Sequence, residues 1–271
     1  MDQSERRLFL LRSLLKEDPQ YRDIRIPDSP EQQQNLLRAL MNVRPARKIS
    51  REFLDVQDEY LRKERDARGI VDGDALAPVP ADSRLVLWQG DITTLKADAI
   101  VNAANSGMCG CFSPLHGCID NIIHSRSGIE LRLTCAAIMR KQGHEEPTGK
   151  AKITPAFNLP CRYILHTVGP IITGRVTESD RQLLASCYRS CLELAAAYWL
   201  ESIAFCCIST GVFCFPNELA AEIAVQTVKE FLQTPTSIKK VIFNVFKDLD
   251  KTIYTKLLCT DGTSENASDR R

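Results

Sequence analysis

The sequence lacks several features that would assign it to a membrane, secreted or nucleic-acid-binding class. Its 271 residues contain no run of about 20 uncharged apolar residues, so we expect no membrane-spanning helix. Charged residues are interspersed from the start and no small-residue cleavage site follows, which indicates no signal peptide. With 35 Lys and Arg against 34 Asp and Glu, the chain lacks the net basic charge that nucleic-acid backbones attract. We therefore expect a cytoplasmic protein with no membrane or nucleic-acid partner.

Cysteine is absent before Cys109, although the chain contains eleven cysteines in all. The odd number, without a secretory signal, argues against a disulfide framework and leaves buried thiols, a metal site or a reactive thiol as alternatives. The densest group consists of Cys109, Cys111 and Cys118, with His116 among them. This short stretch is therefore the first candidate for chemistry.

Residues 1–80 are twice as rich in charge as the rest, with 15 basic and 15 acidic residues. Apolar positions such as Leu37 and Leu40 recur among these charges at helical spacing, which predicts two or three short amphipathic helices. Ser29 followed by Pro30 is typical of a helix start. We interpret this region as a helical extension packed on the main domain, the alternative being an independent binding module. The segment 69–83, rich in Gly, Pro and Asp, is the expected boundary.

From residue 84 onward, short apolar runs alternate with longer helical patterns. The alternation predicts an α/β domain over residues 81–258, with three layers and a mixed or parallel sheet. Asn217 is a possible N-cap of the last predicted helix. Residues 259–271 are polar and predict a disordered tail. The predicted strands span residues 84–90, 98–104, 162–168, 202–209 and 239–246, and the predicted helices span 130–143, 180–200 and 217–233.

Three loops that follow predicted strands hold groups suited to a ligand, because ligands of such sheets bind at the carboxyl ends of the strands. A Gly-Asp-Ile-Thr turn presents the carboxylate of Asp91, and Asn102 and Asn105 present two amides that can bind a polyol. The small residues of the loop 208–216 let backbone N–H groups approach an anion just before a helix. Taken singly, each loop could be a plain turn, a helix cap or an unoccupied connection.

Taken together and in this order, these loops resemble those of the macrodomain family, whose α/β fold binds ADP-ribose. The resemblance covers about residues 84–258. It depends on QGDIT at 89–93, DAIVNAANS at 98–106, TGKAKITPAFNLPCRYILHTVGP at 148–170 and STGVFCFP at 209–216. The implied fold is a three-layer α/β/α macrodomain with a mixed central sheet, preceded here by the small helical extension.

The resemblance also implies a binding role for individual residues. Asp91, with the backbone of Ile92 beside it, would contact the adenine amino group. Asn102 and Asn105 would flank the distal ribose, and Phe215 would pack near it. The loop that would cradle the pyrophosphate consists of Ser209, Thr210, Gly211, Val212 and Phe213.

One stretch departs from the pattern of the familiar hydrolytic macrodomains, which have a glycine run and an acid after NAANS. Matching the shared Gly-Cys-Ile places His116 where that acid would stand, within C-x4-H-x-C. Thiolate and imidazole ligands favour Zn²⁺, with Fe²⁺ or Cu⁺ as alternatives. Cys111, His116 and Cys118 give three ligands and leave one position open, unless Cys109 closes the site. We favour three ligands because the chain resembles the zinc-containing macrodomain subclass.

Other candidates for metal binding are weaker. Cys187, Cys191, Cys206 and Cys207 lie at helix or strand periodicity and are expected to be packing residues. Cys214 stands in the phosphate loop and is either a filler or a thiol that faces the metal. Among the remaining histidines, His124 is the best second candidate.

The function that these inferences imply is zinc-dependent hydrolysis of mono-ADP-ribose from modified protein side chains. Asn102, Asn105 and Asp120 are the expected catalytic residues, with Asp120 orienting His116 or acting as a base. An N-cap or a surface role is the alternative for Asp120. ADP-ribose and a mono-ADP-ribosylated protein are the expected partners. One alternative is a non-catalytic reader of ADP-ribose with a structural zinc, and another is an O-acyl-ADP-ribose deacylase. The acceptor side chain is left open.

Overall fold

A computed structural model describes residues 1–259 of the chain. The predicted tail therefore lies outside the described residues except for Cys259, which ends the last helix. The helices are α1 (Gln3–Glu17), α2 (Pro30–Val43), α3 (Arg51–Arg68), α4 (Ile119–Ser127), α5 (Ile129–Gln142), α6 (Glu178–Ala197), α7 (Asn217–Phe231) and α8 (Asp248–Cys259). The short 3-10 helices are η1 (Pro19–Tyr21), η2 (Gly73–Ala75) and η3 (Ile92–Thr94).

The centre of the fold is a six-stranded mixed sheet with the order β2-β8-β7-β4-β6-β5. Neighbouring strands run parallel except for β5, which pairs antiparallel with β6. These strands are β2 (Leu85–Gln89), β4 (Ala99–Ala104), β5 (Ala151–Pro155), β6 (Tyr163–Val168), β7 (Ser202–Phe205) and β8 (Lys240–Val245). A separate two-stranded ladder joins β1 (Val71–Asp72) to β3 (Leu95–Lys96). All four residues of β7 are buried, as expected for a strand covered on both faces.

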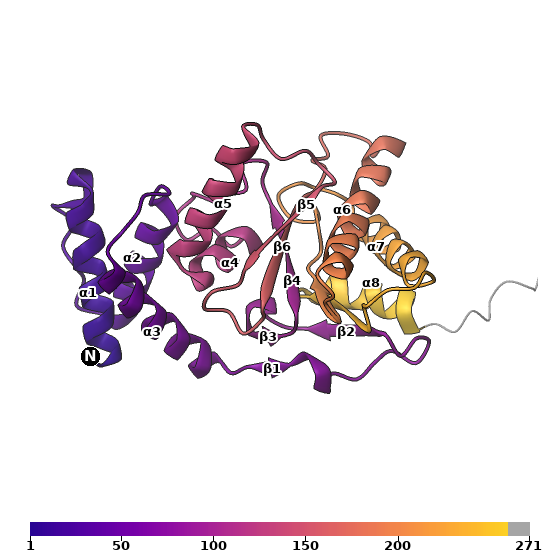
Figure 1. Ribbon diagram of the computed structural model, residues 1–271, viewed down its shortest axis with the longest axis horizontal. Helices are drawn as coiled ribbons and strands as arrows, with labels where there is room; N and C mark the ends of the chain where they lie inside the picture. The colour runs from indigo at the N-terminus through magenta and orange to yellow at the C-terminus, as the bar shows by residue number, and fades with distance from the viewer. Residues whose placement is uncertain (260–271) are drawn as a thin grey trace, which may run out of the picture.

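Helices cover both faces of the sheet, which makes the predicted three layers. In Figure 1, α4 and α5 lie between the N-terminal helices and the strands, and α6, α7 and α8 lie on the other side. The α/β fold with a mixed sheet is thus confirmed. The sequence analysis did not predict β5, α4 or α8, and α4 carries part of the candidate site.

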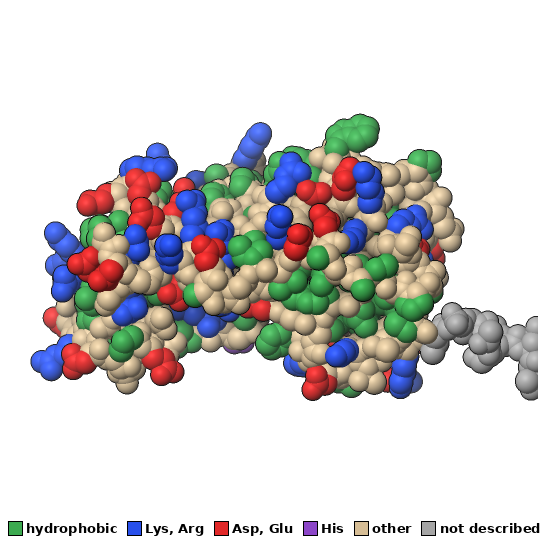
Figure 2. Space-filling view, turned by 90° about the horizontal axis from the view of Figure 1, so that it is seen from below, with side chains coloured by type: hydrophobic (Ala, Val, Ile, Leu, Met, Phe, Trp, Pro, Cys, Tyr) green, Lys and Arg blue, Asp and Glu red, His purple; other side chains and the backbone are tan. Residues whose placement is uncertain are grey.

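The first three helices form a bundle with a hydrophobic cluster of its own. The structure confirms the Ser29 cap, since its side chain accepts from the Gln32 N–H and Pro30 begins α2. Lys, Arg, Asp and Glu side chains are interspersed over this end of the molecule, which Figure 2 shows on the left. The buried members of the cluster are Leu10, Leu11, Leu14, Leu15, Leu37, Leu40, Met41, Phe53, Val56, Tyr60 and Leu61, together with Ile129 of α5.

The prediction that Asn217 caps α7 is wrong. Pro216 occupies the cap position, no side-chain cap bond is made, and Asn217 is the first helical residue. Its Nδ2 instead donates to Oδ1 of Asp250 over 2.6 Å, which ties α7 to α8. Within residues 1–259, no helix is both long and apolar enough to cross a membrane.

Candidate functional site

A large cavity of about 630 Å³ opens at the carboxyl ends of the parallel strands. Its volume lies in the range of small-molecule sites. The lining comes from the ends of β2, β4, β7 and β8 and from the first turns of α4. Its residues include Asp91, Ile92, Asn105, Cys111, His116, Cys118, Asp120, Arg126, Ser209, Thr210, Gly211, Val212, Phe213, Asn244, Phe246, Lys247 and Asp250.

The loop after β7 is built to receive an anion. It is folded back on itself, since the Phe215 N–H donates to the Ser209 oxygen and the Cys214 N–H donates to the Gly211 oxygen. Ser209 has a positive φ of 64°, a conformation that costs free energy in a non-glycine residue and is typical of ligand loops. Among the described residues, no acceptor is found for the N–H groups of Thr210, Gly211, Val212 and Phe213. These donors line the cavity and can bind a diphosphate.

Asp91 and the exposed Phe246 both line the cavity, and they come from neighbouring strand ends. Asp91 accepts from the Thr93 hydroxyl over 2.7 Å and from Arg126, and these bonds lower its pKa although burial alone would raise it. The Gly90 N–H donates to the Val245 oxygen, which brings the end of β8 against this turn. Phe246 follows directly and is 76% exposed. Its ring can stack on a planar ligand ring.

Asp120, on the first turn of α4, is a buried carboxylate held by two asparagines. Asn102 Nδ2 donates to its Oδ1 over 2.8 Å, and Asn105 Nδ2 donates to its Oδ2 over 3.1 Å. Burial raises the pKa of Asp120 to about 6, against the opposing effect of these bonds. No hydrogen bond joins Asp120 to His116 within the described chain, so the expectation that it orients His116 finds no support.

Cys111, His116 and Cys118 come together on the cavity wall. Their ligand atoms lie within 4.8 Å of one another, and Cys111 Sγ is 3.6 Å from His116 Nδ1. Cys118 is also the N-cap of α4, where its Sγ accepts from the Asn121 N–H over 3.4 Å. The helix N-terminus favours the thiolate. Burial raises the pKa of Cys118 to about 11, so that a metal bound here would displace protons.

The loop that carries these ligands needs glycine at one position. Gly110 has a φ of 83°, and a Cβ there would meet the His124 ring at 2.7 Å. The carbonyl of Gly110 accepts from Asn105 Nδ2 over 3.1 Å, and Asn121 Nδ2 donates to the Ser113 oxygen over 2.9 Å. Asn105, which directly follows β4, and Asn121 of α4 therefore fix the path of the loop around the ligand group.

A second group of close side chains, His124, Cys135 and His166, lies buried behind Asp120. Asn102 Nδ2 faces His166 Nδ1 at 3.1 Å, so Nδ1 accepts and Nε2 carries the proton. His166 Nε2 lies 2.9 Å from the Thr154 hydroxyl and, because it carries the proton, offers no lone pair to a metal. Burial raises the pKa of Cys135 to about 12, which favours the neutral thiol. His166 is thus hydrogen-bonded at both ring nitrogens, whereas neither ring nitrogen of His124 has a hydrogen-bond partner among the described residues.

The two cysteines considered as a possible fourth ligand lie outside the ligand group. Cys109 packs against the hydrophobic core, and its carbonyl accepts from Arg132. Cys214 is exposed, with its thiol toward the Val212 oxygen. Neither joins Cys111, His116 and Cys118 among the close metal-ligating groups of residues 1–259.

Most of the residues predicted for the site line the cavity, but two do not. Asn102 is 0% exposed and reaches the cavity only through Asp120, so it is a positioning residue rather than one that flanks a ribose. Phe215 is 1% exposed and belongs to the hydrophobic core.

The sequence analysis missed the part of the cavity that follows β8, and also Arg126 of α4. The rule that ligands bind where parallel strands end would have found Phe246 and Lys247. Phe246 is the last residue of the predicted strand 239–246, and Lys247 follows it directly. Asn244 lies in that strand, and its Nδ2 donates to the Gly90 oxygen over 2.9 Å. Arg126 carried no such signal because α4 itself was not predicted.

Comparisons with known proteins place this site in a family. The Macro domain family matches residues 101–224. A Protein-ADP-ribose hydrolase of Treponema medium is 56% identical over 260 residues, which cover 95% of this chain and all of that protein. A protein of the same name from Staphylococcus aureus is 51% identical, covering 87% of this chain and 88% of the relative.

Solved structures agree with the sequence relatives. A Trypanosoma brucei macrodomain in complex with ADP-ribose has a TM-score of 0.64 at 30% identity, covering 85% of this chain and 96% of that one. The Oceanobacillus iheyensis macrodomain with ADP has a TM-score of 0.58 at 40% identity, covering 64% of this chain and 88% of that one. By its sequence and by its fold, the chain belongs to the Macro domain family.

Proposed function

We propose that this protein is a zinc-dependent hydrolase that removes mono-ADP-ribose from modified protein side chains. One observation carries the proposal: the three metal-ligating side chains, the buried carboxylate of Asp120 and the anion-binding loop all line one cavity. The relatives of 51–56% identity named Protein-ADP-ribose hydrolase support it. The eleven free cysteines fit a reducing compartment such as the cytoplasm.

The ligand group fits Zn²⁺ in donor type and spacing. Two thiolates and one imidazole whose ligand atoms lie within 4.8 Å of one another could hold one Zn²⁺, and three protein ligands would leave a position for water or substrate. Zn²⁺ held there would lower the pKa of a bound water or polarise an oxygen of the ribose or of the scissile linkage.

The protein residues bind and orient the substrate. The N–H groups of the loop 209–213 hold the diphosphate, and the Asp91 end of the cavity receives the adenine. This orientation directs the distal ribose and its linkage toward Asn105, Asp120 and the ligand group. Asp120 Oδ2, held in place by Asn105, is positioned to accept a proton from the attacking water. Asn102 keeps the carboxylate in this orientation from behind.

Replacing Phe246 with alanine is expected to weaken binding of ADP-ribose about tenfold, because stacking of a base on an aromatic ring is lost. Isothermal titration with ADP-ribose measures the effect. Trp199→Ala is the matched control, since Trp199 is 83% exposed and does not line the cavity. Equal affinity of the Phe246→Ala and wild-type proteins would place the adenine elsewhere.

The hydrolase proposal is tested with a panel of proteins that carry mono-ADP-ribose on Asp or Glu, on Ser or on Arg. Free ADP-ribose is measured before chelation, after chelation and after zinc is restored. We expect release from at least one linkage, lost on chelation and recovered with zinc, because metal chemistry of this kind supplies several kcal/mol of transition-state stabilisation.

Other outcomes contradict the proposal in distinct ways. Tight binding of ADP-ribose without release from any linkage would identify a reader. Release of acetate from O-acetyl-ADP-ribose alone would identify a deacylase. Full turnover by protein verified to be free of metal would refute zinc dependence.

A further inference from the structure

The N-terminal helical bundle contacts the loop of the metal-ligating residues directly. Arg38 of α2 donates through Nη2 to the backbone oxygen of His116 and to Oδ1 of Asn121, both over 2.7 Å. Asn121 is 0% exposed, and its Nδ2 holds the Ser113 oxygen of the same loop. One guanidinium of the extension therefore connects the backbone of His116 to α4, the helix whose N-cap is Cys118.

A second residue of α2 holds the neighbouring position of the loop. Asn42 is 1% exposed and accepts from the Leu115 N–H over 3.1 Å, while its Nδ2 donates to the Ser125 hydroxyl over 2.8 Å. Leu115 has a positive φ of 57°, which costs free energy for a leucine and must be held by surrounding contacts. The residue just before His116 thus depends on α2 for its conformation.

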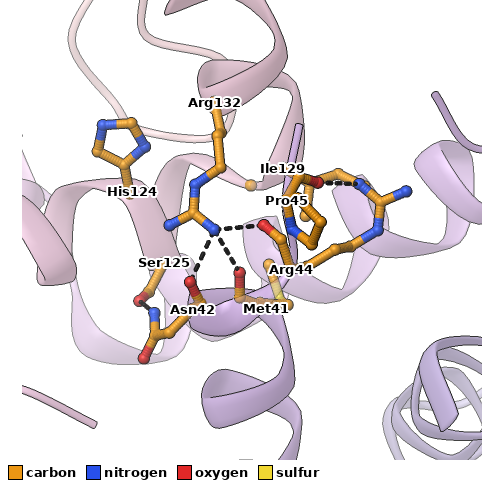
Figure 3. A pocket seen from close by; sticks show the side chains of 9 residues that line it. Met41, Asn42, Arg44, Pro45, His124, Ser125, Ile129 and Arg132 are labelled. Carbon is orange, nitrogen blue, oxygen red and sulfur yellow. Dashed lines mark hydrogen bonds between the residues drawn. The ribbon is translucent and has the colours of Figure 1, made fainter. Parts of the chain in front are cut away.

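Arg132 of α5 completes the connection from the other side. Its Nη1 donates to the backbone oxygens of Met41, Asn42 and Arg44 (Figure 3), which have no partner within α2 because the helix ends there. Its Nε donates to the Cys109 oxygen over 2.7 Å, and its guanidinium lies 4.1 Å from the centre of the Phe112 ring. One arginine therefore joins the end of α2 to the start of the loop.

The position of α2 is itself fixed by the rest of the bundle. Arg44 forms a paired contact with the carboxylate of Glu17 in α1, with both N···O distances at 2.6 Å. Gln57 of α3 is fully buried and accepts from the Ile129 N–H at the start of α5. The bundle is therefore joined rigidly to α5, and α2 cannot move away from the loop without breaking buried contacts.

We propose that the N-terminal bundle is a structural part of the metal centre, and that Arg38 and Asn42 are positioning residues for the ligand loop. The inference rests on the proposed function, because it concerns the same zinc. It assigns to residues 1–80 a role in shaping the ligand group, rather than in binding a separate partner.

The test compares full-length Arg38→Met with Arg6→Met. Arg6 pairs with Glu59 within the bundle and makes no contact with the loop, so its loss controls for a general effect on the helices. Zinc affinity is measured by competition with a chromogenic chelator. Exchange of backbone amides with deuterium over residues 109–118 is measured separately, on metal-free protein.

For Arg38→Met we expect about 10- to 100-fold weaker zinc binding, the usual effect of removing a group that orients a ligand, and faster amide exchange in the loop. Arg6→Met should match the wild type in both. Arg38→Lys keeps the charge and part of the donor capacity, so its zinc affinity and its amide exchange should lie between those of the wild type and Arg38→Met. If Arg38→Met does not fold, Arg38→Lys replaces it in both measurements.

The outcomes separate this inference from the proposed function. A wild-type protein that binds no zinc refutes the zinc proposal, while the exchange measurement still decides whether α2 holds the loop. If wild type and Arg38→Met have equal zinc affinity and equal exchange over residues 109–118, the inference is overturned.

Discussion

Replacement of Cys111 with alanine is expected to abolish zinc binding and to lower the rate of ADP-ribose release by about three orders of magnitude. Within residues 1–259 the proposed ligand group has three side chains, so loss of one would leave two, which is too few to hold the ion tightly. Metal content by mass spectrometry and single-turnover release from a linkage-defined substrate measure the two effects.

Cys109→Ala is the matched control for this prediction. It removes a thiol two residues away that lies outside the ligand group, so one zinc per chain and near-normal turnover are expected. Titration with ADP-ribose should show that Cys111→Ala still binds the nucleotide through the loop 209–213. Zinc loss in both variants would mean four ligands, and unchanged turnover in Cys111→Ala would refute a zinc-dependent reaction.

Replacement of Asp120 with asparagine is expected to lower kcat by about 10²- to 10⁴-fold, the usual contribution of a group that accepts or donates a proton in the reaction. The change removes the buried charge and places an amide against the two donors, Asn102 Nδ2 and Asn105 Nδ2. Zinc content should be unchanged, since Asp120 is not a member of the ligand group. Steady-state kinetics should show a larger change in kcat than in KM.

Asp98→Asn provides the comparison for a structural effect. Asp98 also accepts several hydrogen bonds, from Arg162 over 2.9 Å and from the Glu201 N–H over 2.8 Å, but it lies just before β4, at the opposite end of that strand from the cavity. The Asp98→Asn substitution should lower the thermal unfolding temperature and leave kcat near the wild-type value. If Asp120→Asn loses stability and zinc together while its kcat per bound zinc stays normal, Asp120 has no direct part in the reaction.

The parts of the fold that could be predicted are those with a clear apolar pattern. The strands β4, β6, β7 and β8 are nearly continuous apolar runs because helices cover both faces, and α2 and α6 carry an apolar stripe. Helix α4 has no such stripe because much of its buried surface is polar. The buried polar residues of α4 are Asp120, Asn121, His124, Ser125 and Ser127. Hydrophobic periodicity could not predict α4, because the buried face of this helix carries polar side chains that line the site and hold the ligand loop.

The sequence by itself determined the group of candidate metal ligands, because Cys111, His116 and Cys118 lie within eight residues and a short loop brings them together. It also determined three of the loops that line the cavity, since the carboxyl ends of parallel strands meet at one edge. Only the tertiary structure decided that Asn102 faces Asp120 rather than the cavity. It also decided that α2 holds the ligand loop. Arg38 and the carbonyl of His116 are 78 residues apart, and no local pattern encodes a hydrogen bond that exists only after α2 has packed against the loop that carries His116.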